Sequence, residues 1–147
     1  MYQNYPLETK TLVSTTEVDV RFSEVDSLRV VWHGNYLLYF ELGREAFGKQ
    51  YDLEYLQVYD KGFVVPLVKT LVEHKSPLMY GDTAVIETTL IDNPAAKIHF
   101  QYRIYNKATG KLSATGETVQ VFVDNDGDLF ITMPPFFTEW KKAYLNV

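Results

Sequence analysis

The sequence predicts an α+β domain in which one long helix lies on one face of an antiparallel sheet. Three observations support this fold class. Residues 36–49 carry apolar side chains at helical spacing. The segments around them are rich in β-branched and aromatic residues, which favour strands. The later predicted strands follow one another without helical crossovers, which disfavours a parallel βαβ fold. A length of 147 residues suits a single domain over residues 1–147.

The first predicted strand covers residues 11–22. Within it Val18, Val20 and Phe22 alternate with charged residues, the pattern of a strand with one buried face. An irregular stretch follows before the helix begins.

The long helix is predicted to begin at Tyr36, with Asn35 as its N-cap. Its apolar face consists of Tyr36, Tyr39, Phe40, Gly43, Ala46 and Phe47. A second, short helix is expected over residues 53–59. Glycines inside the long helix indicate places where a neighbouring backbone comes close.

Four further strands and a terminal helix complete the prediction. The short connections at 106–110 and 124–127 join antiparallel neighbours. Pro134 and Pro135 open a helix with Phe137, Trp140 and Tyr144 on one face. The expected strands are residues 63–74, 83–91, 97–105 and 111–123. The last of them are long enough to curl around the helix.

Composition and charge exclude several classes of protein. The net charge is −5 and no basic stripe offsets it, which disfavours nucleic-acid binding. The absence of cysteine excludes disulfides, thiolate nucleophiles and Cys-based metal sites. Residues 1–10 contain no apolar run and no window approaches ~18 consecutive apolar residues, so neither a secretory signal nor a membrane span is expected. We therefore expect a soluble, cytoplasmic protein.

Two features of the sequence are candidate metal sites, an acidic segment and the three histidines. Residues 124–128 resemble the start of a calcium loop, but Gly127 is at the fourth position and no Glu follows at the twelfth, which favours a hairpin turn. His33, His74 and His99 lie far apart without ligand spacing. No metal site is predicted.

The chemistry is expected in residues 21–36, where polar side chains precede a helix N-terminus. Such a terminus carries partial positive charge and unpaired N–H donors, which can stabilise an oxyanion. Asp26 could attack an acyl carbon or orient a water molecule that does. The alternative is that Asp26 only fixes a loop and Asn35 only caps the helix. Position by itself favours that structural interpretation.

Two blocks of the sequence resemble hotdog-fold acyl-CoA thioesterases of the 4-hydroxybenzoyl-CoA thioesterase type. The first block has an Asp nine residues before Asn-x-x-x-x-Phe/Tyr-Glu, a His-x-Asn-Tyr entry to the helix, and an Arg three residues after the Glu; here these are Asp26, 33–36, Glu41 and Arg44. In the second block, residues 76–82 resemble the family's Pro-x-x-Tyr-Gly-Asp turn. The resemblance extends from Val18 to Phe122 and implies a curved antiparallel sheet wrapped around one long helix.

The resemblance also implies roles for individual residues. Asp26 would be the catalytic carboxylate, and His33 would contact the acyl group or its carbonyl. Backbone N–H groups from Gly34 to Tyr36 would polarise the thioester carbonyl, while Asn35 and Tyr36 would shape the pocket entrance. The family forms dimers, often paired into tetramers, with the acyl pocket at the interface. The expected reaction is hydrolysis of an acyl-CoA to a free acid and CoA, without a metal or redox cofactor.

One departure from the family pattern leaves alternatives open. Arg29 stands where the family often has Gly, and a positive φ there would strain an arginine. The alternatives are an acyl-carrier-protein thioesterase, a non-catalytic acyl-binding module, and a hotdog hydratase or dehydratase. The last needs a histidine paired with a carboxylate, and His33 is the one histidine suitably placed.

Overall fold

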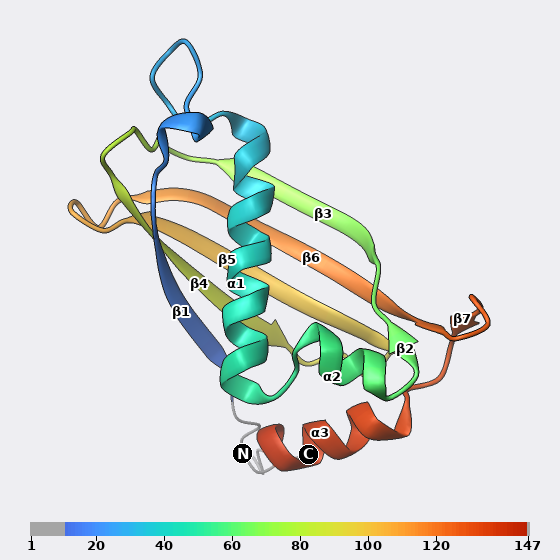
Figure 1. The fold of residues 1–147 in the computed structure, drawn as a ribbon. Coiled ribbons are helices and arrows are strands. Elements are labelled where there is room, and N and C mark those ends of the chain that lie inside the picture. Colours follow the sequence, from blue (N-terminus) through green and yellow to red (C-terminus); the bar gives the residue numbers. More distant parts are fainter. Residues whose placement is uncertain (1–10, 147) are drawn as a thin grey trace, which may run out of the picture.

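Seven strands form one antiparallel sheet, and the long helix α1 lies across one of its faces (Figure 1). A computed structural model describes residues 11–146. The sheet order is β1-β4-β5-β6-β2, with β3 and β7 also paired to β6. The elements are β1 (Val13–Asp19), α1 (Tyr36–Tyr51), α2 (Tyr55–Asp60), β2 (Phe63–Val64), β3 (Leu67–His74), β4 (Thr83–Ile91), β5 (Lys97–Asn106), β6 (Leu112–Asp124), β7 (Leu129–Phe130) and α3 (Pro135–Leu145). This is the hotdog arrangement that the sequence predicts.

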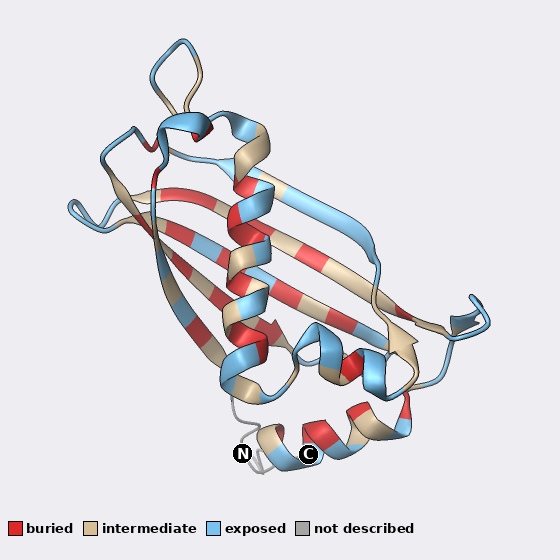
Figure 2. Cartoon of the chain, in the orientation of Figure 1, coloured by how far each residue is buried: buried red, intermediate tan, exposed pale blue. Residues whose placement is uncertain are grey.

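The buried face of α1 is the predicted one. Of its six residues, all but Ala46 are buried, and Ala46 is half-buried. Figure 2 shows the same alternation on the sheet, where buried residues recur at every second position of β4 and β5. Phe40 stacks on Tyr102, with ring centroids 4.3 Å apart, and Phe47 meets Phe100 edge-on at 4.9 Å. Aromatic contacts therefore fix the helix on the sheet.

The strand predicted over residues 63–74 is divided in two. Val65 and Pro66 separate β2 from β3, and the register with β6 shifts between Leu67 and Lys69. Proline has no N–H to donate to a sheet ladder, so the pairing breaks at Pro66.

The first strand is shorter than predicted. It ends at Asp19, and Phe22, expected to face inward, is 77% exposed. The chain turns instead into a 3-10 helix, Phe22–Glu24, and the ring of Phe22 packs edge-on against Tyr80. The strand alternation therefore holds only as far as Val20, which is buried.

Helix α3 packs under the end of α1. As predicted, Phe137 and Trp140 are buried on one face, and the indole N–H of Trp140 donates to the carbonyl oxygen of Tyr51 at 2.7 Å. In the part of the chain that the structure describes, no helix is long and apolar enough to cross a membrane.

A substitution at Gly43 tests how closely α1 lies on the sheet. A Cβ at this position would be 2.4 Å from Thr88 Oγ1 and 3.0 Å from Ile86 Cγ2. Gly→Ala inside a helix ordinarily stabilises by about 1 kcal/mol. We expect Gly43→Ala to destabilise instead, by about 1–3 kcal/mol, because the added methyl overpacks the contact.

Urea unfolding followed by circular dichroism measures the difference. Glu45→Ala, on the exposed face of α1, is the control and should change the free energy of unfolding by no more than ~0.5 kcal/mol. A Gly43→Ala variant more stable than the wild type would contradict the close approach.

Candidate active site

Asp26 opens a tight turn that stands beyond the N-terminal end of α1. Val25 pairs with Val31 in an isolated bridge, and the N–H of Asp26 donates to the carbonyl oxygen of Val30 at 2.9 Å. Asp26 Oδ1 accepts the N–H of Leu28 at 2.8 Å, and the N–H of Arg29 donates to the Asp26 carbonyl oxygen at 2.9 Å. One carboxylate oxygen therefore holds the turn, as the structural interpretation of Asp26 requires. The other oxygen has no hydrogen bond within residues 11–146.

Arg29 adopts the left-handed backbone conformation that its position in the family pattern would give to glycine. Its φ is +69°. For a residue with a Cβ this conformation costs roughly 1–2 kcal/mol. This strained residue lies three positions after Asp26, and the side chain of Arg29 is exposed.

Glu24 joins this loop to α1. Its carboxylate Oε1 accepts the N–H of Arg21 at 2.8 Å and the hydroxyl of Tyr39 at 3.0 Å. Its carbonyl oxygen accepts the N–H of Trp32 and the side-chain amide of Asn35, both at 2.8 Å. Glu24 is buried, and nothing in the sequence analysis singled it out. Because Glu24 lies two residues before Asp26, these four hydrogen bonds make it the structural support of the candidate site.

The N-cap prediction for Asn35 is wrong. The residue has helical dihedral angles, φ −73° and ψ −15°, and its side chain makes no capping hydrogen bond. A 3-10 helix, His33–Asn35, runs directly into α1, so the change from extended to helical backbone occurs at Trp32. The side chain of Asn35 instead donates from Nδ2 to the carbonyl oxygen of Glu24.

Of the backbone amides from Gly34 to Tyr36, two have acceptors inside the turn. The N–H of Asn35 donates to the carbonyl oxygen of Trp32 at 2.9 Å, and that of Tyr36 to the carbonyl oxygen of His33. Within residues 11–146 the N–H of Gly34 has no backbone acceptor. A Cβ at Gly34 would lie 2.1 Å from the indole of Trp32, so a larger residue would require that half-exposed ring to move. Of the three amides, that of Gly34 is thus the one without a backbone acceptor among the described residues.

A cavity of about 270 Å³ adjoins this amide-bearing turn. Two predicted site residues, His33 and Tyr36, line this cavity. His74, at the end of β3, also lines it, and the sequence did not indicate it as a site residue. The ring of His74 lies edge-on to Tyr36 at 5.0 Å and to His33 at 6.4 Å, measured between centroids. The fold thus brings together two histidines that lie far apart in the sequence, and His74 is a strand residue as predicted. The predicted site residues Asp26, Gly34 and Asn35 are not among the lining residues, which are Val31, His33, Tyr36, His74, Lys75, Ser76 and Pro77.

The two tyrosines at the start of α1 are held in the neutral form. Burial raises the pKa of Tyr36, and a hydrogen bond to the backbone of Leu78 partly opposes the rise. Burial also raises the pKa of Tyr39, well above its usual range, and the hydrogen bond to Glu24 adds to the effect. Tyr39 is therefore a hydrogen-bond donor to Glu24 rather than a base.

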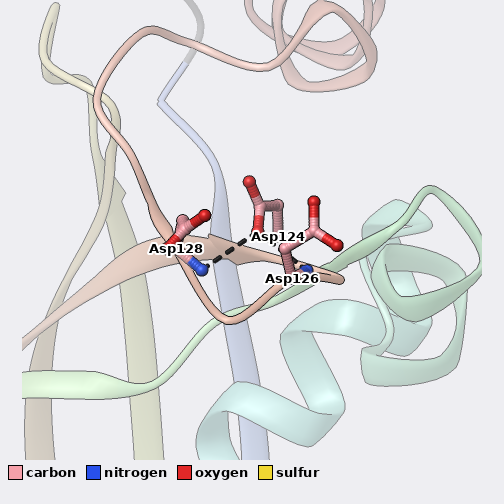
Figure 3. A group of neighbouring side chains, drawn as sticks. All are labelled: Asp124, Asp126 and Asp128. Atoms are coloured by element: carbon pink, nitrogen blue, oxygen red, sulfur yellow. Dashed lines mark hydrogen bonds between the residues drawn. The ribbon is translucent and has the colours of Figure 1, made fainter.

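An acidic cluster outside the candidate site consists of Asp124, Asp126 and Asp128 (Figure 3). Asp124 Oδ1 accepts the N–H groups of both Asp126 and Asp128 at 3.0 Å, closing the connection between β6 and β7. The predicted hairpin turn is confirmed.

Comparison with known proteins identifies the family. The sequence profile described as "Thioesterase-like superfamily" matches residues 20–141. The chain belongs to this superfamily. It is 36% identical over 132 residues to a protein of Bacillus subtilis named as the putative acyl-CoA thioesterase YneP, a match that covers 90% of this chain and 95% of the relative.

Two further relatives agree with this assignment. The structure of a DHNA-CoA thioesterase from Staphylococcus aureus superimposes with a TM-score of 0.80 at 26% identity, covering 90% of this chain and 88% of the other. An acyl-acyl carrier protein thioesterase from Arabidopsis thaliana is 26% identical over 109 residues, which is 74% of this chain and 57% of the relative. The predicted hotdog fold and thioester hydrolase class are confirmed.

Removal of the Tyr39 hydroxyl tests the attachment of the loop. Tyr39→Phe leaves Glu24 with one donor fewer, and we expect a loss of about 1–3 kcal/mol in the free energy of unfolding at neutral pH. A tyrosine whose pKa is raised by folding stabilises the native state fully below pH ~10 and loses that contribution as the pH rises further. Wild-type stability should therefore fall above pH ~10, and less steeply in Tyr39→Phe.

Urea unfolding at pH 7 to 11.5 measures both effects. Tyr55→Phe, at an exposed position of α2, is the control and should leave the profile unchanged. Parallel alkaline profiles for the wild type and Tyr39→Phe would count against the Tyr39–Glu24 contact.

Proposed function

We propose that this protein hydrolyses acyl-CoA thioesters with Asp26 as nucleophile or general base. The observation that carries the proposal is that Glu24, two residues before Asp26, fastens this loop to Asn35 and Tyr39 at the start of α1, where the N–H of Gly34 has no backbone acceptor among the described residues. The name of the Bacillus subtilis relative and that of the Staphylococcus aureus enzyme support a CoA thioester as substrate.

Two routes lead from Asp26 to the same products. As a nucleophile, the carboxylate attacks the thioester carbon, CoA leaves as thiolate, and water then hydrolyses the mixed anhydride. As a base, it takes a proton from water, whose oxygen attacks the carbon and expels the thiolate. In both routes negative charge develops on the carbonyl oxygen. The N–H of Gly34, the partial positive charge at the start of α1 and the imidazole of His33 would stabilise it.

A second copy of the chain would complete the site. Asp26 does not line the cavity at His33 and Tyr36 in the single chain. Strand β3 is exposed along nearly its whole length and carries apolar Leu67, Val68 and Leu71 at its surface. Because β3 ends at His74, a copy paired along this edge would lie beside the cavity. We therefore propose a homodimer joined along β3, which could pair further into a tetramer.

The neutral variant Asp26→Asn tests the catalytic assignment. An asparagine Oδ1 can still accept the N–H of Leu28, so the turn should persist, while nucleophilicity and basicity are lost. We expect kcat for acyl-CoA hydrolysis to fall by at least ~100-fold. The measurement is release of free CoA thiol across a panel of acyl-CoA substrates.

Asp82→Asn is the matched control. Asp82 also uses a side-chain oxygen to hold a turn, accepting the N–H of Met79 at 2.8 Å, and its substitution should leave kcat nearly unchanged. Near-normal activity of Asp26→Asn on every good substrate would refute its role. Tight binding of acyl-CoA by the wild type without any hydrolysis would indicate a binding module.

Sedimentation tests the homodimer. We expect a dimer or tetramer at micromolar concentration, and the double substitution Val68→Lys/Leu71→Lys should yield monomers and lower activity, because charges on the edge oppose strand pairing. Ile131→Lys, at an exposed apolar position outside β3, should change neither property. A fully active monomer would exclude a shared site.

The Arabidopsis relative favours one second candidate, an acyl-carrier-protein thioester as substrate. Measuring kcat/KM for the same acyl group on CoA and on carrier protein decides between the two. A hydratase would need a carboxylate paired with His33, and within the single chain the described lining of the cavity holds no Asp or Glu. Assaying enoyl-CoA hydration beside thiol release tests that alternative directly.

A further inference from the structure

A second and larger cavity, of about 590 Å³, lies along the C-terminal half of α1 and under α2. Figure 1 shows α2 beside this end of α1, over the β5 and β6 side of the sheet. The volume is within the range of pockets that hold small organic ligands. None of the predicted site residues lines it.

The inner wall of this cavity is apolar. Val58, Ile98 and Phe100 are buried, and Leu53 and Val65 beside them are half-buried. These five side chains come from α2, β5 and the segments flanking α2 and β3. The wall suits a hydrocarbon or aromatic body.

Arg44 is the charged group on the inner side of the cavity. Its side chain is only 16% exposed. Within residues 11–146 it makes one hydrogen bond, from Nη1 to the hydroxyl of Tyr102 at 3.2 Å. That hydroxyl also contacts Thr118 Oγ1 at 2.6 Å, and burial raises the pKa of Tyr102, so the partner of Arg44 is a neutral group. The other four N–H donors of the guanidinium have no hydrogen-bond partner in the part of the chain that the structure describes.

No acidic residue among those that line the cavity forms a hydrogen bond with Arg44, although Glu41 forms a long ion pair with it. Glu41 Oε1 is 3.9 Å from Nη2, beyond hydrogen-bond distance, and the Glu41 side chain is 61% exposed. Glu45 is exposed and pairs with Lys49 at 3.6 Å, and Glu54 is exposed as well. These carboxylates are at the solvated rim, where charge interactions are weak. Among the described residues, Arg44 therefore has one neutral hydrogen-bond partner and one long, solvated ion pair, although desolvating a charge is costly without a close partner.

We propose that this cavity binds a carboxylate carried on an apolar body. The two carboxylate oxygens bind the free N–H groups of Arg44 in the paired geometry that guanidinium favours, and the body lies against Val58, Ile98 and Phe100. The carboxylate can belong to a free organic acid or to the distal end of an acyl group. The second source rests on the proposed thioesterase function, whereas binding of the free acid does not.

Calorimetric titration with octanoate and with its neutral counterpart octanamide tests the site on the whole protein. We expect the wild type to bind octanoate at least ~10-fold more tightly than octanamide, and Arg44→Met to abolish that preference. Arg44→Lys keeps the charge but not the paired geometry and should retain part of it. Lys49→Met, which removes a rim cation, is the matched control and should change octanoate affinity less than twofold.

Three results of the titration would overturn the proposal. They are equal binding of acid and amide by the wild type, unchanged octanoate binding by Arg44→Met, and equal losses in Arg44→Met and Lys49→Met. Circular dichroism and urea unfolding of Arg44→Lys and Arg44→Met show whether each variant is folded. If Arg44→Met does not fold, the octanoate preference of Arg44→Lys is compared with that of the wild type instead.

Kinetics distinguish the two sources of the carboxylate. If the ligand is an acyl group, kcat/KM for an acyl-CoA with a distal carboxylate, relative to octanoyl-CoA, should fall at least ~10-fold in Arg44→Met. If that ratio is unchanged while octanoate binding is lost, the ligand is the free acid. Hydrolysis of no thioester at all would refute the proposed function but not the carboxylate site, which the titration tests separately.

Discussion

The candidate site depends on the burial of one carboxylate, that of Glu24. Its side-chain and backbone oxygens accept hydrogen bonds from four groups that belong to the incoming strand connection, the 3-10 helix and α1. Two of them, the N–H of Arg21 and the hydroxyl of Tyr39, replace water that the buried carboxylate loses, and the other two bind the Glu24 carbonyl oxygen. Without them the Asp26 turn would be joined to α1 only through a few backbone contacts. The geometry of the site is thus set by a residue that takes no part in the proposed chemistry.

The sheet and α1 set the second constraint. Gly43 brings the helix against β4 so closely that side chains of β4 occupy the space of a Cβ. Gly48 does the same where the chain turns toward α2, since a Cβ there would be 2.7 Å from the carbonyl oxygen of Leu53. The start of α1 is thereby held at the small cavity, and its C-terminal half forms one wall of the large one. One rigid helix thus positions both cavities.

Much of the fold could be predicted from periodicity, because burial on one side imposes it. The buried face of α1 and the alternation along β4 both follow from this rule. The division at Pro66 was readable from the missing N–H of proline. The Asn35 cap was mispredicted because a capping preference assumes an extended approach to the helix, and here a 3-10 helix precedes it. His74 could not be placed beside His33, since 41 residues separate them and only the β3 register brings them together.

The left-handed turn at Arg29 has a consequence for how this loop tolerates sequence change. Glycine would relieve the steric cost, but it would also enlarge the number of conformations available to the unfolded chain. The two effects oppose each other, and the steric cost, about 1–2 kcal/mol, is larger than the entropy effect of about 0.4–1 kcal/mol. Any residue with a Cβ bears a similar steric cost at position 29. Selection among such residues can therefore set the sign of the charge near Asp26 with little further change in stability, which lets related enzymes diverge here in the electrostatics that a substrate meets on entry.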